Sequence, residues 1–177
     1  MTNSIQDLMS SKLGHKEKII AMTETALMDK KALAELFDIL RTGHDVAKGT
    51  VAEVMKYISK ENPDVMLPYI DLLIEYVDYK VPKVRWGCPE SIGYIACKYP
   101  DEAGKAIPKL LGNLEDKSTV VRWCAAFALT EIAKYNHGKQ KELITNFLQL
   151  IKTEQNNGVR NLYIKAIKDI ENQIIRG

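Results

Sequence analysis

Two copies of one tripeptide are the residues of this chain best suited to recognising a partner. Val84-Arg85-Trp86 recurs as Val121-Arg122-Trp123, and Val159-Arg160 marks a third, partial copy. An arginine guanidinium makes paired hydrogen bonds with carboxylate groups, and a tryptophan ring is a frequent anchor in binding interfaces. These side chains predict recognition of a partner, and they include no nucleophile or general base.

The tryptophans are predicted to lie on the side of their helices that faces away from the core. Trp86 and Trp123 each follow the valine of their repeat by two positions, which turns them about 200° around a helix. Phe127 and Glu90 share that face in one repeat each. The candidate binding residues are Trp86, Trp123, Phe127, Glu90, Arg85, Arg122, Arg160, Lys165 and Lys168.

Two roles are open for the three repeated arginines. Each follows an acidic residue by six or seven positions, namely Asp78, Asp116 and Glu154. In the first role the turn carboxylate of one repeat pairs with the arginine of the same or the next repeat and holds the units together. In the second role the arginines form a basic stripe for an acidic ligand. For the tryptophans, burial between neighbouring repeats is likewise the alternative to exposure in a groove.

The repeated valines are separated by a nearly constant distance along the chain. The spacings from Val84 to Val121 and from Val121 to Val159 are 37 and 38 residues, and Val46 stands 38 residues before Val84. The copy that opens at Val46 has Ala47 where the others have arginine. A fixed period of this size is typical of an array of similar supersecondary units.

Each unit is predicted to be a pair of helices. The second helix carries an apolar stripe such as Val121, Ala125 and Ile132. Prolines and polar residues punctuate the boundaries, so turns are expected near residues 61, 80, 99, 117, 136 and 156. The first helices of the pairs are expected over Asp64–Asp78, Asp101–Leu114 and Lys139–Lys152, after an earlier pair at Lys16–Met28 and Lys30–Arg41 and a short helix in the first dozen residues.

One stretch resembles a HEAT repeat. The acidic turn from Glu115 to Arg122, followed by the alanine-rich run from Cys124 to Leu129, is the clearest match, and the resemblance extends over about residues 29–175. It implies an all-α protein, an α–α superhelix (a right-handed solenoid) of about four to five HEAT-like helical hairpins. In such folds the second helices line the concave surface, which would place both tryptophans in a groove.

The resemblance also implies one domain over residues 1–177. Its repeat-bearing pairs are expected at about 29–60, 63–98, 100–135 and 138–175, and residues 1–28 are expected to form N-terminal capping helices. The proline of Gly87-Cys88-Pro89 lies within the helix that opens at Val84, where it predicts a local bend that adjusts the stacking of the repeats.

The overall composition and charge do not by themselves indicate a particular class of partner. The formal charge of +2 does not demand a nucleic acid or a membrane surface as partner, and no apolar run is long enough for a membrane span. Without a secretory signal the chain is expected to be cytoplasmic, with its three cysteines reduced. No catalytic, cofactor-binding or metal-binding group is indicated, and no oligomeric state is predicted.

The favoured function is a non-enzymatic scaffold or adaptor that binds a protein or peptide segment in the concave groove. The alternative is a nucleic-acid-binding protein or a repair protein of the HEAT-like DNA alkylpurine glycosylase type, since those enzymes place tryptophan, arginine and an acidic residue in such a groove. A third class, the HEAT-containing bilin lyases, lacks a recognisable chromophore site here. The lysines and arginines of the groove are interrupted by Glu90 and Glu131, which favours the adaptor over a nucleic-acid reader.

Overall fold

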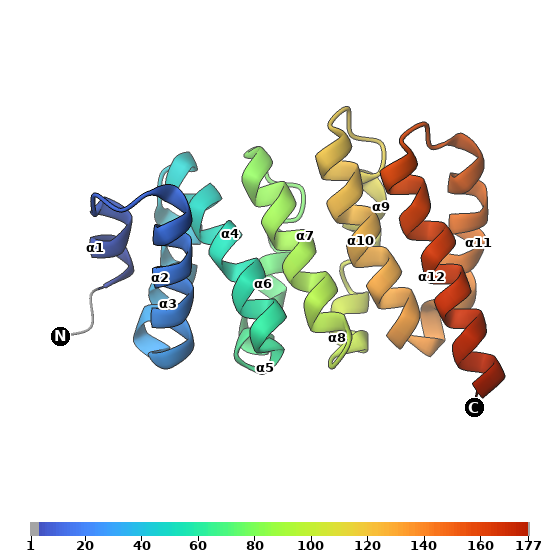
Figure 1. Ribbon diagram of the computed structural model, residues 1–177, viewed down its shortest axis with the longest axis horizontal. Coiled ribbons are helices and arrows are strands. Elements are labelled where there is room, and N and C mark those ends of the chain that lie inside the picture. The colour runs from blue at the N-terminus through green and yellow to red at the C-terminus, as the bar shows by residue number, and fades with distance from the viewer. Residues whose placement is uncertain (1–3, 177) are drawn as a thin grey trace.

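The protein is a stack of antiparallel helices. The computed structural model describes residues 4–176, and every regular element within them is a helix (Figure 1). The all-α prediction is therefore confirmed, and breaks between helices occur near each expected turn. The elements are α1 (Ile5–Ser10), α2 (His15–Met28), α3 (Lys30–Thr42), α4 (Asp45–Glu61), α5 (Pro63–Met66), the 3₁₀ helix η1 (Leu67–Tyr69), α6 (Ile70–Glu75), α7 (Pro82–Ala96), α8 (Pro100–Gly104), α9 (Ile107–Asn113), α10 (Thr119–Tyr135), α11 (His137–Thr153) and α12 (Asn157–Arg176).

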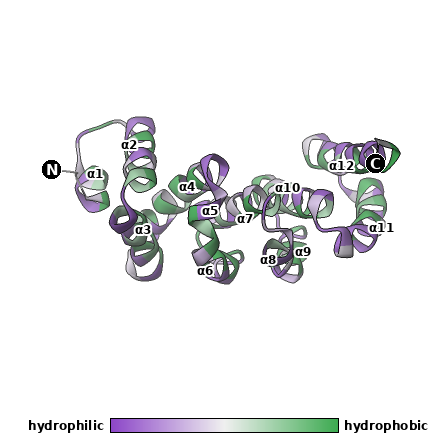
Figure 2. Cartoon of the chain, turned by 90° about the horizontal axis from the view of Figure 1, so that it is seen from below, coloured by the Kyte–Doolittle hydropathy of each residue, from purple (hydrophilic) through white to green (hydrophobic). Residues whose placement is uncertain are grey.

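The helices form two layers. Figure 2 shows α2, α4, α7, α10 and α12 in one layer and α3, α6, α9 and α11 in the other. Within the first layer α2 and α12 stand further out than α4, α7 and α10, so this layer presents a concave face. α1 and α12 lie at opposite ends of the stack (Figure 1). The shape is an elongated solenoid in which each unit packs mainly on its neighbours.

Prolines interrupt two helical segments of the second layer, those that pair with α7 and with α10. The helices expected over Asp64–Asp78 and Asp101–Leu114 are present but divided, since the chain forms α5, η1 and α6 in the first stretch and α8 and α9 in the second. Pro68 lies in η1 and Pro108 in the first turn of α9. Proline has no N–H to donate to the carbonyl four residues earlier and its ring crowds that carbonyl, so each helix breaks and restarts.

The apolar stripes predicted for the second helices form the core. Ile92 and Leu129 each have 0% of their surface exposed, as expected. The cysteines are free thiols, with Cys88 and Cys124 buried and Cys97 exposed. Burial raises the pKa of the Cys88 thiol to about 12, which leaves that thiol protonated and unreactive at neutral pH.

The register expected for α4 is wrong by one residue. Val46 is 75% exposed, whereas Ala47 is 5% exposed and lies 37 residues before the buried Val84. Ala47 therefore opens the buried stripe, and Lys48 occupies the position of the repeated arginine, 37 residues before Arg85. The ammonium of Lys48 is buried and donates hydrogen bonds to the carbonyls of Leu40 and Arg41 at the end of α3.

Small residues let α4, α7 and α10 approach one another closely. A Cβ added to Gly87 would overlap the carbonyl oxygen of Ala52 in α4, and one added to Gly93 would lie 2.7 Å from the ring of Phe127 in α10. α7 continues through Pro89, which is buried inside it. The tight packing of α7 on both neighbours fixes the positions of the side chains that α7 presents on the concave face.

Candidate functional site

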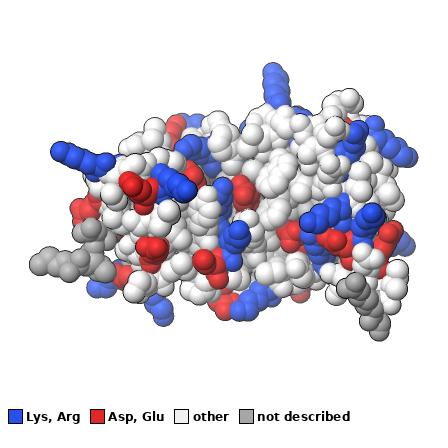
Figure 3. Space-filling view, viewed as in Figure 1, with Lys and Arg blue, Asp and Glu red and all other residues white. Residues whose placement is uncertain are grey.

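The concave face is built by the second helices of the pairs together with α2. Figure 3 shows a broad uncharged area over α10 and its contact with α7, whereas acidic and basic side chains gather toward both ends of the face. Exposed apolar side chains on the helices of this face include Tyr57, Val120 and Ile164. An apolar surface rimmed by charges is typical of a site for a partner.

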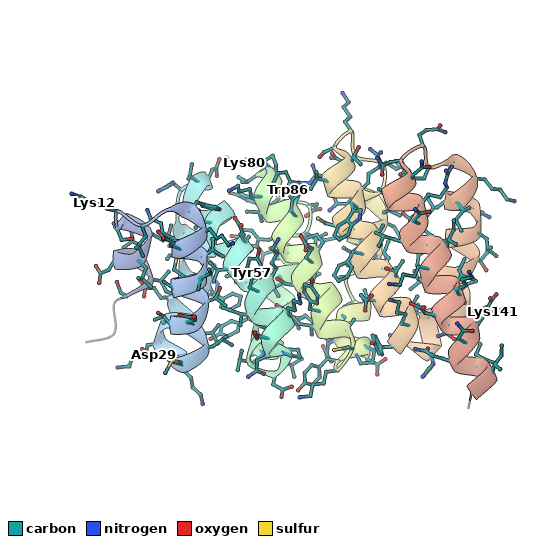
Figure 4. All side chains as sticks on the ribbon, viewed as in Figure 1. Lys12, Asp29, Tyr57, Lys80, Trp86 and Lys141 are labelled. Atoms are coloured by element: carbon teal, nitrogen blue, oxygen red, sulfur yellow. The ribbon has the colours of Figure 1, made fainter. Side chains whose placement is uncertain are left out.

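Trp86 lies in a hollow between helices. It is half-buried near the start of α7 (Figure 4) and lines a cavity of about 310 Å³ together with residues of α2, α4 and α10. Its indole nitrogen is buried and has no hydrogen-bond acceptor among the described residues. Because that nitrogen is shielded from solvent, a partner in the hollow would contact the exposed part of the Trp86 ring and not its N–H.

Trp123 belongs to an aromatic cluster one repeat further on. It is half-buried and its ring is stacked on that of Phe127 with the centroids 5.7 Å apart. Phe127 in turn contacts Tyr94 of α7 at 5.1 Å between centroids. The three rings join α7 to α10 and leave part of their surface at the concave face.

The expectation for the two tryptophans holds in part. Each lies on a second helix and neither is buried in the core, so both are partly accessible. Trp123 nevertheless packs against the edge of the core, which is the packing role considered as its alternative. Their binding role stays a prediction.

Arg85 connects two successive helical pairs. Its guanidinium lies 2.7 Å from the carboxylate of Asp116, in the turn before α10, and donates to the side-chain oxygen of Asn113 at 3.0 Å. Asn113 is itself buried and donates to the carbonyl of Val77. The backbone N–H of Ser118 and then the Arg85 guanidinium hold the pKa of Asp116 below its ordinary value.

Arg122 repeats this connection one unit later. It donates through Nε and Nη2 to the two carboxylate oxygens of Glu154, at 3.0 and 3.2 Å. It also donates to the carbonyl of Asp116 at 2.9 Å. The hydrogen bonds from Arg122 hold the pKa of Glu154 below its ordinary value. Arg85 and Arg122 therefore form a ladder between units. Its direction is the reverse of the expected one, because each turn carboxylate meets the arginine of the preceding unit and not that of the same or the next unit.

The basic residues expected on α12 have a different setting. Arg160 is half-buried and donates to the side chain of Asn157 within its own first turn. Lys165 and Lys168 are exposed. Within residues 4–176, no carboxylate lies within ion-pair distance of these three side chains, so their charges remain available at the C-terminal end of the face.

Glu90 lies in the middle of the concave face and is largely enclosed. Its carboxylate is 3.6 Å from the ammonium of Lys56 in α4 and 3.5 Å from the thiol of Cys124 in α10. Nearby, Glu53 contacts His15 at 3.0 Å and Lys83 at 3.6 Å. These contacts balance acidic and basic side chains across the centre of the face.

Several residues of this face were not identified from the sequence as candidate site residues. Tyr57 and Tyr94 occupy equivalent positions 37 residues apart, as do Glu53 and Glu90. The signal was the period itself, since a spacing of 37 residues from Tyr94 leads directly to Tyr57. The misplaced register at Val46 hid this correspondence.

The comparisons with known proteins agree with this architecture. The HEAT repeat family model matches residues 106–135. A solved structure of a designed armadillo repeat protein in complex with the peptide (KR)4 is similar to this chain, with a TM-score of 0.74 and 18% identity over 94% of this chain and 80% of that one. No curated protein sequence matches the chain.

The fold and the family match define the class of protein. The chain contains a HEAT repeat, and its fold is an armadillo-like solenoid of helical repeats. In the described part of the chain, no helix combines the length and apolar character that crossing a membrane requires. Nor do residues 4–176 bring together three or more side chains suited to hold a metal ion.

Proposed function

We propose that this chain is a non-enzymatic scaffold that binds an extended segment of a partner protein along its concave face. The observation that carries the proposal is the hollow of about 310 Å³ that is lined by the half-exposed ring of Trp86. Half-exposed aromatic rings continue from this hollow to Trp123 and Phe127. Large aromatic side chains that are left outside a core are typical binding anchors.

The spacing of the two tryptophans supports an extended ligand. Packed helices lie about 8–10 Å apart, so Trp86 and Trp123 on adjacent second helices are separated by about three residues of extended chain at ~3.3 Å each. A peptide crossing the helices would therefore meet one ring and then the other.

The structural relative supports a peptide over other ligands. That designed armadillo repeat protein holds a peptide, (KR)4. The charged side chains in the centre of the present face are paired with one another, as in Lys56 with Glu90 and Lys83 with Glu53. A protein that reads nucleic acid needs a continuous basic track, which these pairs do not provide. The reduced cysteines agree with a cytoplasmic location, which is part of the proposal.

Selection of peptides from a phage-displayed library of short random sequences tests the proposal. The enriched peptides would be synthesised, labelled with fluorescein and titrated by fluorescence polarisation against the wild type and the Trp86→Ala/Trp123→Ala variant. The double variant should lose binding by about a hundredfold or more, because interface tryptophans contribute ~2–4 kcal/mol each. Leu148→Ala, at an exposed residue of α11 in the opposite layer, is the matched control and should bind as the wild type does.

Three results would contradict the proposal. The first is a double variant that binds the enriched peptides as tightly as the wild type. The second is a circular dichroism spectrum showing that the double variant is unfolded, which would assign both rings to packing between repeats. The third is binding of duplex or single-stranded DNA by the wild type with a steep salt dependence. The last result would favour the nucleic-acid-binding alternative.

A further inference from the structure

An apolar cleft lies at the N-terminal end of the concave face, between α2 and α4. Its volume is about 370 Å³, and its apolar walls come from Ile19, Ile20 and Leu27 of α2 and from Tyr57 of α4 (Figure 4). Ile20 is 47% exposed and Tyr57 is 42% exposed. This volume is within the range of about 300–1,000 Å³ typical of ligand sites. The cleft adjoins the hollow at Trp86, because His15 and Glu53 line both.

The two ends of the cleft carry opposite charges. Lys16 lines one end, whereas Glu24 and Glu61 line the other. In the part of the chain that the structure describes, no oppositely charged side chain lies within 4.0 Å of any of these three. The remaining charged groups along the cleft, His15 and Glu53, are paired with each other at 3.0 Å. The carboxylates of Glu24 and Glu61 lie toward the C-terminal ends of α2 and α4, where the helix dipoles add to their negative potential.

The length of the cleft can be compared with that of a peptide. Lys16 and Glu24 are eight residues apart on one helix, which corresponds to about 12 Å at ~1.5 Å per residue. The first and fifth residues of an extended five-residue segment are about 13 Å apart, four steps of ~3.3 Å each. In an extended chain, alternate side chains point to the same side, so the first, third and fifth residues of such a segment would all face the cleft.

We infer that this cleft binds an extended segment of the partner with the pattern acidic, any, apolar, any, basic. The acidic side chain pairs with Lys16, the apolar side chain lies between Ile20 and Tyr57, and the basic side chain lies between the carboxylates of Glu24 and Glu61. The segment is extended and not helical, because in a helix its first and fifth residues would be only about 6 Å apart at ~1.5 Å per residue, half the separation of Lys16 and Glu24.

This inference rests on the proposed function, since the segment belongs to the same partner that crosses the concave face. It adds sequence specificity to that binding. The hollow at Trp86 and the rings at Trp123 accept apolar and backbone groups, whereas the cleft selects the charge pattern of the segment and the direction in which its chain runs. The orientation of the helix dipoles places the basic end of the segment near the C-terminal ends of α2 and α4.

Parallel selections from the phage-displayed peptide library test this specificity. The library would be selected on the wild type, on Glu24→Lys/Glu61→Lys, on Ile20→Lys and on the matched control Glu75→Lys/Glu142→Lys. The control reverses the same number of charges at exposed positions of α6 and α11, in the opposite layer. All substituted residues are exposed, and circular dichroism would verify that each variant is folded.

The wild type and the control should enrich the acidic, any, apolar, any, basic pattern. The variant Glu24→Lys/Glu61→Lys should change the preference at the last position from basic to acidic, with about a tenfold change in the ratio of the two, since reversing a charge contact alters partner choice on this scale. Ile20→Lys should lose the preference for an apolar residue at the central position.

The outcomes separate this inference from the proposed function. Peptides that require Trp86 and Trp123 but show the same pattern on the wild type and on Glu24→Lys/Glu61→Lys would overturn the cleft alone. A wild type that enriches no peptide at all would overturn both. Peptides whose last position responds to the charge reversal, but whose binding is unchanged in Trp86→Ala/Trp123→Ala, would support the cleft and contradict the tryptophan anchors.

Discussion

The guanidinium of Arg122 and the carboxylate of Glu154 form two parallel hydrogen bonds, at 3.0 and 3.2 Å, between consecutive helical pairs. Arg122 is in α10, and Glu154 lies in the turn between α11 and α12. Both side chains are largely shielded from water, with 18% and 9% of their surface exposed. A paired, shielded contact of this geometry fixes the stacking of one unit on the next more firmly than a surface ion pair does.

Replacement of Arg122 by alanine should therefore destabilise the fold. The expected loss in the free energy of unfolding is about 1–3 kcal/mol, because the carboxylate of Glu154 would remain shielded after losing both donors of Arg122 and would keep a backbone donor from Asn156. Urea denaturation monitored by circular dichroism measures it. Arg160→Ala is the control: Arg160 has no carboxylate partner among residues 4–176, so its replacement should change stability by no more than about 0.5 kcal/mol. Equal effects of the two substitutions would contradict the structural role of the ladder.

The same contacts predict how stability depends on pH. The pKa values of Asp116 and Glu154 are lowered from 3.8 and 4.5, by the Ser118 N–H and Arg85 for the first and by Arg122 for the second. A carboxyl group whose pKa is depressed in the folded state stabilises that state above its unfolded pKa, and the stabilisation is lost as the pH falls through the folded value. Stability should thus be steady near neutral pH and decrease below about pH 4.5.

Denaturation at a series of pH values, with Arg122→Ala as the comparison, measures this dependence. The variant should lose less stability on acidification than the wild type, because Glu154 loses the largest cause of its lowered pKa. Parallel curves for the two proteins would show that the hydrogen bonds of Arg122 do not set the pKa of Glu154.

Truncation of the buried stripe should be costly at equivalent positions of two repeats. Ile92 and Leu129 are fully buried, and alanine at either position should lower the free energy of unfolding by about 2–5 kcal/mol. Thermal or urea denaturation measures the effect. Val46→Ala, at a position that is 75% exposed, is a control for loss of an apolar side chain and should have little effect. Costs below about 1 kcal/mol at both Ile92 and Leu129 would mean that another face of these helices is buried.

The close approach of α7 to α4 predicts opposite effects at two glycines. Alanine is favoured over glycine within a helix by about 1 kcal/mol, so Gly112→Ala, whose added Cβ meets nothing within 4 Å, should stabilise the protein. Gly87→Ala should destabilise it by about 1–3 kcal/mol, because the Cβ overlaps the backbone carbonyl of Ala52 and the two helices must move apart. Stabilisation by both substitutions would contradict the packing of α7 on α4.

The fold could be predicted from the sequence because the repeat signals itself in two independent ways. The valines at a period of 37 to 38 residues identify the units, and the apolar stripe in each unit identifies its buried face. The register of the α4 unit was wrong because Val46 is apolar but exposed, and hydrophobicity alone does not distinguish it from the buried Ala47. The exact limits of the helices on either side of Pro68 and Pro108 depend on how the restarted helices pack, which the period does not encode.

The candidate site was predicted less completely. Angular position placed Trp86 and Trp123 outside the fully buried stripe, because helical geometry depends only on sequence spacing, but it did not indicate that Trp123 packs against the edge of the core. The stacking of Trp123 on Phe127 and the enclosure of Glu90 by Lys56 and Cys124 arise from side-chain orientations across helices. The cleft between α2 and α4 lies outside the clear repeats, where no periodic signal could indicate it.

Tryptophan fluorescence during titration with an enriched peptide is the most direct measurement of the central claim. The chain contains two tryptophans, and both are on the concave face, so their emission reports on that face alone. Trp86→Phe and Trp123→Phe isolate each ring in turn. The wild type and both single variants should show a saturable change in emission, with the same midpoint that fluorescence polarisation gives for each protein. Binding that saturates by polarisation while the emission of both tryptophans stays constant would contradict a partner site on the concave face.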